Sequence, residues 1–567
     1  MKQRAYQTVL IPLIAGLCIW ATTPVAAQDH ELMQDDEPTQ DTTETEVDHQ
    51  HHAAAAVPVY SNLGSHARPI TTASQMAKTY FDQGLRLQYG FNHAEAIRAY
   101  EAALENDPEC AACYWGIALA AGPNINAPMD AGNGKRAYGA IQKAVTLADN
   151  ASPVERDLIN ALAKRYDENP EAERPPLDAA YADAMAVVAS SYPDDADVQT
   201  LYASSLMNLR PWDYWSGDYD DRSPNPGTEE LVAALETAME INPNNPGACH
   251  YYIHAVEAAY PEKAESCADR LAGLMPGAGH IVHMPGHIYV RVGRYADAVR
   301  ANEHAVHEDE SYIADQSPMG IYPAAYYPHN YHFMAFAATM AGMSEKAMEA
   351  SETVSPKVPR EVAMEVTFIQ NAVVLPQLTA VTFGKWDEVL EMPEPDQDLY
   401  HAAAMDAYAR GVALAAKGNA EKARESLAKI AELEKKGNPD GQQTVYSIAA
   451  HALEGEILLR SGDAAGAVPH FQVAVGLEDK MKYEEPPLWY YPLRHSLGRA
   501  LLEAGQPAEA EAVYRKDLAK FRKNGWSLYG LAKSLEMQGK SDEAEAVQKE
   551  FEEAWAHADV ELTSSRF

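Results

Sequence analysis

The chain has 567 residues, of which 83 are Asp or Glu and 45 are Lys or Arg, so its formal net charge is −38. This acidity argues against a nucleic-acid groove or an anionic membrane surface, because both require clustered Lys and Arg. Hydrophobic residues make up 47% of the chain, which excludes global disorder and allows a large buried core.

Residues 1–27 have the pattern of a signal peptide. A basic start precedes an apolar run at residues 9–21, and Val25 and Ala27 have the spacing that signal peptidase requires. We expect cleavage after Ala27 and export to the periplasm or the medium. No later stretch reaches 18 apolar residues, so no transmembrane helix is expected after signal removal. Without its two basic residues the mature net charge is −40, which predicts a neutral or basic partner and no nucleic acid.

The next segment is strongly acidic. Residues 28–52 contain nine acidic residues and no Lys or Arg, so they lack the apolar surface needed to fold. We assign residues 28–70 to an acidic, disordered leader.

A 34-residue pattern recurs between residues 75 and 560. It places a large residue at position 4, Gly or Ala at 8, Ala at 20, an aromatic residue at 24, Ala at 27 and Pro at 32. The first copy contains Tyr80, Gly84, Ala96, Tyr100, Ala103 and Pro108. Small residues at positions 8 and 20 let two helices approach closely, and the large residues fill the gap to the next hairpin. About nine such hairpins, some irregular, predict an all-α helical-hairpin solenoid.

This pattern resembles the tetratricopeptide repeat (TPR) superfamily. Four segments are also similar to a family of exported bacterial TPR proteins related to the tetratricopeptide repeat protein 38 group: CYWGIALAAGPNIN, ACHYYIHAVEA, HMPGHIYVRVGRYADA and GWSLYGLAKSLEMQGK with the terminal SSRF. The TPR resemblance implies a scaffold that binds proteins or peptides. The narrower resemblance implies architecture and assigns no reaction.

Proline distribution suggests where the array divides. Residues 351–400 contain five prolines and fit the repeat poorly. We therefore expect an N-terminal TPR segment at 71–350, an irregular connector at 351–400 and a C-terminal TPR segment at 401–567.

Nine of the 20 histidines fall within residues 250–332, where even spacing would place about three. They form the motifs His250-x3-His254, His280-x2-His283-x3-His287 and His329-x2-His332, with His304 and His307 between them. Spacings of three and four place side chains on one face of a helix. In the TPR register, positions 2, 5 and 9 line the concave groove, and five of these histidines occupy them. His250 and His254 join them if the register slips by one residue, whereas His304 and His307 are expected on the surface.

Imidazole is the commonest neutral ligand of Zn, Cu, Ni or Fe in proteins. We predict a transition metal ion (Cu, Zn or Fe) held by His250, His254, His280, His283, His287, His329 and His332. Binding of a non-metal ligand in a polar groove, and plain packing, remain open alternatives. Pro285 predicts a kink or a helix start within this motif, because proline lacks an N–H.

Aromatic residues accompany the histidines along the expected groove. The candidate contacts to a peptide, protein or small ligand are Tyr251, Tyr252, Tyr327, Tyr331, Trp115 and Trp212. Trp212 belongs to an aromatic and acidic loop that either caps the groove or packs between repeats.

Four cysteines remain after signal removal, an even number for an oxidising compartment. Of the three possible pairings we favour Cys110–Cys113 with Cys249–Cys267, the latter on the two helices of one hairpin. The CxxC spacing is also used by redox and zinc sites, but no thioredoxin-like context accompanies it.

The sequence contains no HExxH, GxSxG, P-loop or GxGxxG motif, so enzymatic activity depends on the histidines alone and stays open. Together these features predict an exported TPR scaffold that binds a peptide, protein or small ligand in a concave Tyr- and His-rich groove. The alternative is a transition-metal-binding protein or metalloenzyme.

Overall fold

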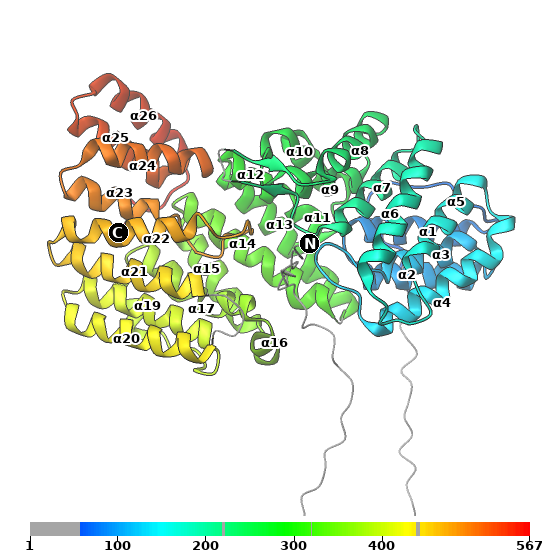
Figure 1. Ribbon diagram of the computed structural model, residues 1–567, viewed down its shortest axis with the longest axis horizontal. Coiled ribbons are helices and arrows are strands. Elements are labelled where there is room, and N and C mark those ends of the chain that lie inside the picture. Colours follow the sequence, from blue (N-terminus) through cyan, green and yellow to red (C-terminus); the bar gives the residue numbers. More distant parts are fainter. Residues whose placement is uncertain (1–56, 218–220, 319, 438–442) are drawn as a thin grey trace, which may run out of the picture.

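The computed structural model describes residues 57–217, 221–318, 320–437 and 443–567, and within them 26 α-helices (Figure 1). The expected signal peptide and residues 28–56 of the expected leader lie outside the described residues. The helices stack as antiparallel hairpins, and those from α19 to α26 lie one above another at the left of Figure 1, which confirms the all-α helical-hairpin solenoid.

The first half of the chain contains α1 (Gln75–Tyr89), α2 (His93–Asn106), α3 (Ala111–Ala120), α4 (Ala131–Leu147), α5 (Pro153–Leu162), α6 (Arg174–Ser191), α7 (Ala196–Leu209), α8 (Thr228–Ile241), α9 (Pro246–Val256), α10 (Glu265–Leu274), α11 (Gly279–His283), α12 (Pro285–Val292) and α13 (Tyr295–Gln316). A two-stranded antiparallel ribbon, β1 (Trp215–Ser216) and β2 (Ser223–Pro224), lies between α7 and α8.

The second half contains α14 (Tyr327–Met340), α15 (Ser344–Val354), α16 (Arg360–Glu365), α17 (Gln370–Thr382), α18 (Trp386–Glu391), α19 (Tyr400–Ala416), α20 (Ala420–Gly437), α21 (Gln443–Arg460), α22 (Ala464–Glu478), α23 (Arg494–Glu503), α24 (Pro507–Lys520), α25 (Gly525–Met537) and α26 (Ser541–Ala554). A π-helical turn at Tyr322–Tyr326 precedes α14. In the described ranges, none of the helices has both the length and the apolar character that crossing a bilayer requires.

The glycines of the repeat pattern make room for an aromatic ring between successive hairpins. A Cβ added at Gly84 or at Gly116 would lie 2.6 Å from the ring of Tyr100, so the tyrosine of one repeat packs against two glycines. Gly498 and Gly530 enclose Tyr514 in the same way, at 2.2 Å. The spacing of small and large residues therefore sets the distance between helices.

We expect Gly84→Ala to lower the free energy of unfolding by about 1–3 kcal/mol, because the new methyl overlaps the buried ring of Tyr100. Gly139→Ala in α4 is the matched control. No atom lies within 4 Å of its added Cβ, so it should be neutral or stabilise the helix by up to about 1 kcal/mol. Urea unfolding followed by circular dichroism measures both. Equal midpoints for the two variants would contradict the packing role of Gly84.

The C-terminal hairpin packs back on the middle of the chain. The indole N–H of Trp526 in α25 donates to the carbonyl of Thr339 in α14 at 3.0 Å, and Trp555 packs against Gly342. Residues 351–400 form the short helices α16 and α18 and the proline-containing α17. The division of the array at this connector stays a prediction.

The expected end of the leader at residue 70 is wrong, because residues 57–70 pack on the solenoid. Leu63 is buried, and the guanidinium of Arg68 contacts Asp195 at 2.8 and 3.0 Å and Asp197 at 3.4 Å. The Nε2 of His66 lies 3.0 Å from the carboxylate of Asp197. These residues are part of the folded protein.

Candidate metal centre

Four short stretches of helix bring six of the predicted histidines together. α9 carries His250 and His254, and α11 carries His280 and His283. His287 lies in α12, which starts at Pro285 and so follows a break after α11. His329 lies in the first turn of α14. The break at Pro285 was expected from its missing N–H.

The six rings form two groups of three. In the first triad, His250, His254 and His280, one ring nitrogen from each lies within 4.8 Å of the others. The second triad, His283, His287 and His329, meets the same limit. Five of the six rings are buried, and His329 is partly exposed. We call these six residues the histidine cluster.

His332 lies outside both triads, although its spacing from His329 suggested otherwise. Burial lowers its pKa to about 4. His304 and His307 on α13 are exposed, as expected for the second helix of a hairpin.

Protein acceptors fix one nitrogen of four of these rings. His250 Nδ1 lies 2.6 Å from the carbonyl oxygen of Tyr89. His254 Nδ1 and His287 Nδ1 lie 3.0 and 2.6 Å from the two carboxylate oxygens of Glu257. Each acceptor has lone pairs and no proton to give, so each ring in its neutral form carries its proton on Nδ1 and its lone pair on Nε2.

His283 follows the same rule through an amide. Its Nδ1 lies 2.7 Å from Oδ1 of Asn302, whose Nδ2 donates to the carbonyl of Ala298 at 2.8 Å. Because the amide nitrogen is already a donor to that carbonyl, Oδ1 faces the ring and accepts its Nδ1–H. The Nε2 of His283 is therefore a lone pair.

These Nε2 lone pairs point at one another in a buried space. Among the described residues, the Nε2 atoms of His250 and His254, and both ring nitrogens of His280, have no hydrogen-bond partner. The Nε2 atoms of His283 and His287 lie 2.8 Å apart. Two lone pairs at that distance repel unless a proton or a cation lies between them. The arrangement is that of metal ligands oriented by outer partners.

The electrostatics keep most of these rings neutral and Glu257 ionised. Burial, and then the neighbouring imidazoles, lower the pKa well below its ordinary value for four rings: His250, His280, His283 and His329. Burial alone would raise the pKa of Glu257, but the rings of His287 and His254 lower it to about 2. Burial alone would lower the pKa of His287, but the neighbouring carboxylate of Glu257 raises it overall. Neutral imidazole is the form that binds metal.

Aromatic rings pack against both triads. Phe91, whose φ of 56° is left-handed, has ring centroids 4.5 Å from His250 and 5.5 Å from His280. Phe333 lies 4.9 and 4.8 Å from His283 and His287. Each triad therefore rests on one phenylalanine, which excludes water from the space around the nitrogens.

Trp212, Asn126 and Tyr326 form a hydrogen-bonded group beside the first triad, which we call the cover. The Trp212 ring lies 5.0 Å from that of His254, and the Tyr326 ring lies 4.7 Å from that of His280. Asn126 joins the two, accepting from the indole N–H of Trp212 at 3.1 Å and donating to the hydroxyl of Tyr326 at 3.0 Å. Three loops distant in sequence thus meet above the imidazoles.

The expected aromatic groove is only partly assembled. Tyr251 lies 5.3 Å from His250, and Trp212 belongs to the cover. The other members point elsewhere: Tyr252 donates to Glu236, Tyr327 and Tyr331 donate to Glu310, and Trp115 is buried within α3. The prediction of one continuous Tyr- and His-rich groove is therefore wrong for these tyrosines, because glutamates on α8 and α13 hold their hydroxyls.

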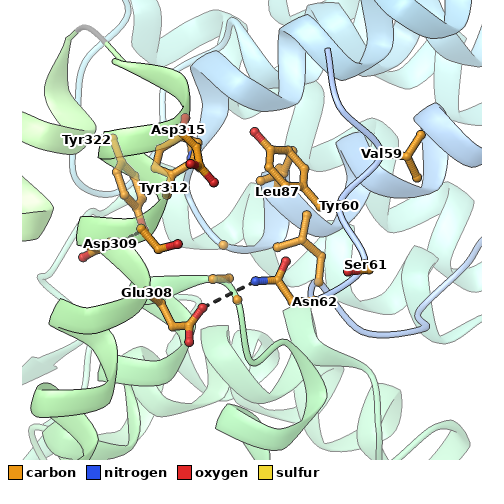
Figure 2. A pocket seen from close by; sticks show the side chains of 17 residues that line it. Val59, Tyr60, Ser61, Asn62, Leu87, Glu308, Asp309, Tyr312, Asp315 and Tyr322 are labelled. Carbon is orange, nitrogen blue, oxygen red and sulfur yellow. Dashed lines mark hydrogen bonds between the residues drawn. The ribbon is translucent and has the colours of Figure 1, made fainter.

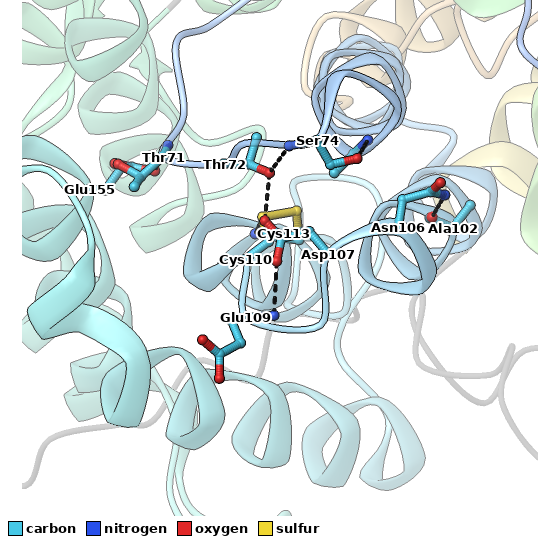
Figure 3. Close-up of a disulfide and its surroundings, with 11 residues drawn as sticks. Thr71, Thr72, Ser74, Ala102, Asn106, Asp107, Glu109, Cys110, Cys113 and Glu155 are labelled. Atoms are coloured by element: carbon cyan, nitrogen blue, oxygen red, sulfur yellow. Dashed lines mark hydrogen bonds between the residues drawn. A yellow bond between two sulfur atoms is a disulfide. The ribbon is translucent and has the colours of Figure 1, made fainter.

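One of the two favoured disulfides is present. Cys110 and Cys113 are bonded at the start of α3, close to Asp107, which accepts from Thr72 (Figure 3). Cys249 and Cys267 are buried free thiols with sulfur atoms 3.0 Å apart. The expected second bond is not formed, although α9 and α10 bring the two residues together as expected.

A cavity of about 280 Å³ lies between residues 59–63 and α13 (Figure 2). Tyr60, Glu308 and Tyr312 line it, with Asp309 and Tyr322. Burial raises the pKa of Asp309 to about 7. The backbone N–H of His280 donates to the hydroxyl of Tyr322, which donates to Asp309 at 2.9 Å. The cavity is thus joined to the His280 backbone by two hydrogen bonds.

Solved structures share the helical-repeat character at low similarity. The APC/C hetero-tetramer Cut9-Hcn1 has 13% identity, covers 84% of this chain and 76% of its own, and has a TM-score of 0.29. The human IFIT1 dimer with m7Gppp-AAAA has 14% identity, covers 87% of this chain and 92% of its own, and has a TM-score of 0.29. Yeast Tom70 has 12% identity, covers 84% of this chain and 90% of its own, and has a TM-score of 0.28. With TM-scores this low, no argument about function follows from them.

The sequence matches no curated protein. A tetratricopeptide repeat model matches residues 81–121 and 495–559, that is α1–α3 and α23–α26. The narrower resemblance to the tetratricopeptide repeat protein 38 group stays a prediction. The chain is an all-α solenoid that matches a tetratricopeptide repeat model over residues 81–121 and 495–559.

Proposed function

We propose that this protein binds a transition metal, Cu, Zn or Fe, through its histidine cluster. The observation that carries the proposal is the set of Nε2 lone pairs fixed toward one another by acceptors on Nδ1. Burying these polar atoms without partners is costly, and a metal ion is the ligand that satisfies several of them at once.

The donor set also limits the chemistry. Three neutral imidazoles leave at least one coordination position open, as in catalytic rather than structural zinc sites. They add no negative charge, so a divalent ion held there attracts an anion or lowers the pKa of a bound water. An ion in this site supplies Lewis acidity or, for Cu or Fe, redox chemistry.

The repeats support a second role as an exported interaction scaffold. Tetratricopeptide segments at α1–α3 and α23–α26 present helix faces of the kind that bind peptides. The charge of −38 favours a neutral or basic partner, and the expectation that nucleic acid is excluded rests on this charge. Binding to such a partner should weaken between low and physiological salt in a pull-down.

Removing one ligand from each triad tests metal binding. We expect the full chain, purified from its native compartment, to contain stoichiometric metal, and the double variant His280→Ala/His329→Ala to contain almost none. His332→Ala is the control, because it removes a half-buried imidazole outside both triads. Metal analysis is combined with melting curves, since saturating ligand at about 100 Kd adds about 2.7 kcal/mol. Metal-free protein whose melting temperature does not respond to Cu²⁺, Zn²⁺ or Fe²⁺ would remove the proposal.

A further inference from the structure

Building on the proposed function, we infer that the histidine cluster holds two metal ions, one in each triad, with Glu257 shared between them. The two triads have the same construction. Each contains a ring that donates Nδ1–H to Glu257, His254 in one and His287 in the other. Each also contains a ring held by a different acceptor, the Tyr89 carbonyl or the Asn302 amide. His280 and His329 complete the sets.

The position of Glu257 separates the two sites. A ring that donates Nδ1–H to a carboxylate directs its Nε2 lone pair to the opposite edge of the ring. The Nε2 of His254 therefore points away from Glu257, and it groups with His250 and His280. The Nε2 of His287 likewise points away and lies 2.8 Å from that of His283. One carboxylate thus contacts a ligand of each triad, and with His254 and His287 it forms a third group whose donor atoms also lie within 4.8 Å of one another.

The triads are close to the size that one ion requires. Three nitrogens at 2.0–2.1 Å from a tetrahedral ion lie about 3.4 Å apart, so nitrogens within 4.8 Å need only small ring rotations. Across the boundary, the His254 and His287 rings lie 5.5 Å apart and those of His280 and His283 lie 5.9 Å apart. These separations are no larger than the 6.3 Å between the His254 and His280 rings within the first triad, so the two triads adjoin, and the inferred pair of ions has a bridging ligand between them.

The charge balance indicates what that bridge is. Glu257 is the one carboxylate that these rings contact among the described residues, and it serves two ions. Six neutral imidazoles leave most of the charge of two divalent ions uncompensated in a buried space. A hydroxide or another small anion between the ions offsets this charge, as in two-metal sites that polarise a substrate oxygen.

Metal counting tests the inference on the full chain. Protein stripped with a chelator is loaded with Cu²⁺ or Zn²⁺, freed of excess metal by gel filtration and measured by mass spectrometry. We expect two ions per chain in the unaltered protein and in His332→Ala, and one in each of His280→Ala and His329→Ala. Circular dichroism checks that every variant is folded. His280→Ala removes no hydrogen bond of the ring among the described residues, because neither of its ring nitrogens makes one, so the fold should be preserved.

Electron paramagnetic resonance of the Cu²⁺ form gives a second readout that needs no variant. Two neighbouring Cu²⁺ ions couple, so the unaltered protein should show reduced signal intensity or a half-field line, and each single variant should show an isolated Cu²⁺ signal. One uncoupled ion per chain would overturn the pair and leave the proposed function standing. No bound ion would overturn both. A folded single variant that loses both ions would overturn the assignment of separate triads.

Discussion

Glu257→Gln is expected to weaken metal binding by about 10–100-fold, the usual cost of losing an outer partner of a histidine ligand. Glu257 is fully buried, and its two oxygens accept from His254 and His287 at 3.0 and 2.6 Å. Glutamine keeps the shape but presents one oxygen and one NH₂. The ring that meets the NH₂ has to turn its Nδ1 into an acceptor, which moves its proton to Nε2. That ring then has no lone pair for a metal, so one triad loses more affinity than the other.

Competition with a chromophoric chelator measures the affinities. Glu262→Gln is the matched control, because it is the same substitution five residues further on and its carboxylate forms an exposed ion pair with Arg522. An exposed pair contributes little, so this variant should bind metal as the unaltered protein does. If Glu257→Gln and Glu262→Gln retain the same affinity, Glu257 does not orient the ligands and the shared-carboxylate geometry is wrong.

The repeat pattern could be predicted from the sequence because it reflects packing between residues that are close together in the chain. Gly84 and Tyr100 lie sixteen residues apart in one hairpin, so here the ring that needs the space is close in sequence to the glycine that provides it. Similarly, spacings of three and four along α9, α11 and α12 were enough to predict five members of the histidine cluster. The register failed for His332, which lies outside both triads although it follows His329 by three residues, the spacing that also separates His280 from His283.

The residues that surround the histidine cluster could not be predicted from sequence spacing in the same way. Phe91, Asn126, Trp212 and Tyr326 meet only because the superhelix brings the loops before α2, α4 and β1 close to α14. No local sequence pattern predicts these contacts. The contact of Glu257 with two rings likewise depends on the position of His287, 30 residues away.

Long-range ion pairs explain the misplaced end of the leader. The acidic composition stops at residue 52, and nothing near Arg68 signals that it pairs with Asp195 and Asp197, more than 120 residues later. Composition predicts which segments cannot fold on their own. It does not predict that a segment packs on the protein through one buried arginine, because that depends on the carboxylates with which the arginine pairs.

Asp197→Ala is expected to lower the free energy of unfolding of the N-terminal region by about 3–5 kcal/mol, because it breaks a buried charged network. One oxygen of Asp197 accepts from His66, Tyr89 and Asn245 at 3.0, 2.8 and 2.9 Å, and the other lies 3.4 Å from Arg68. The carboxylate joins the segment before α1 to α1, α7 and the start of α9. Its loss leaves the buried Arg68 with Asp195 as its remaining carboxylate contact.

The destabilisation caused by Asp197→Ala should depend on pH, and it should become smaller as the pH falls. Burial alone would raise the pKa of Asp197, but the hydrogen bond from His66 and the charges of His66 and Arg68 lower it to about 2, below the unfolded value near 3.8. The contribution of Asp197 is therefore complete above about pH 5 and declines as the pH falls toward 2. Unfolding by urea from pH 7 to pH 2.5 should show the difference between the unaltered protein and Asp197→Ala shrinking by about 2 kcal/mol. Asp194→Ala, an exposed aspartate three residues earlier, should stay within about 0.5 kcal/mol of the unaltered protein throughout. A difference that is constant across this range would mean that Asp197 acts through packing rather than through its charge.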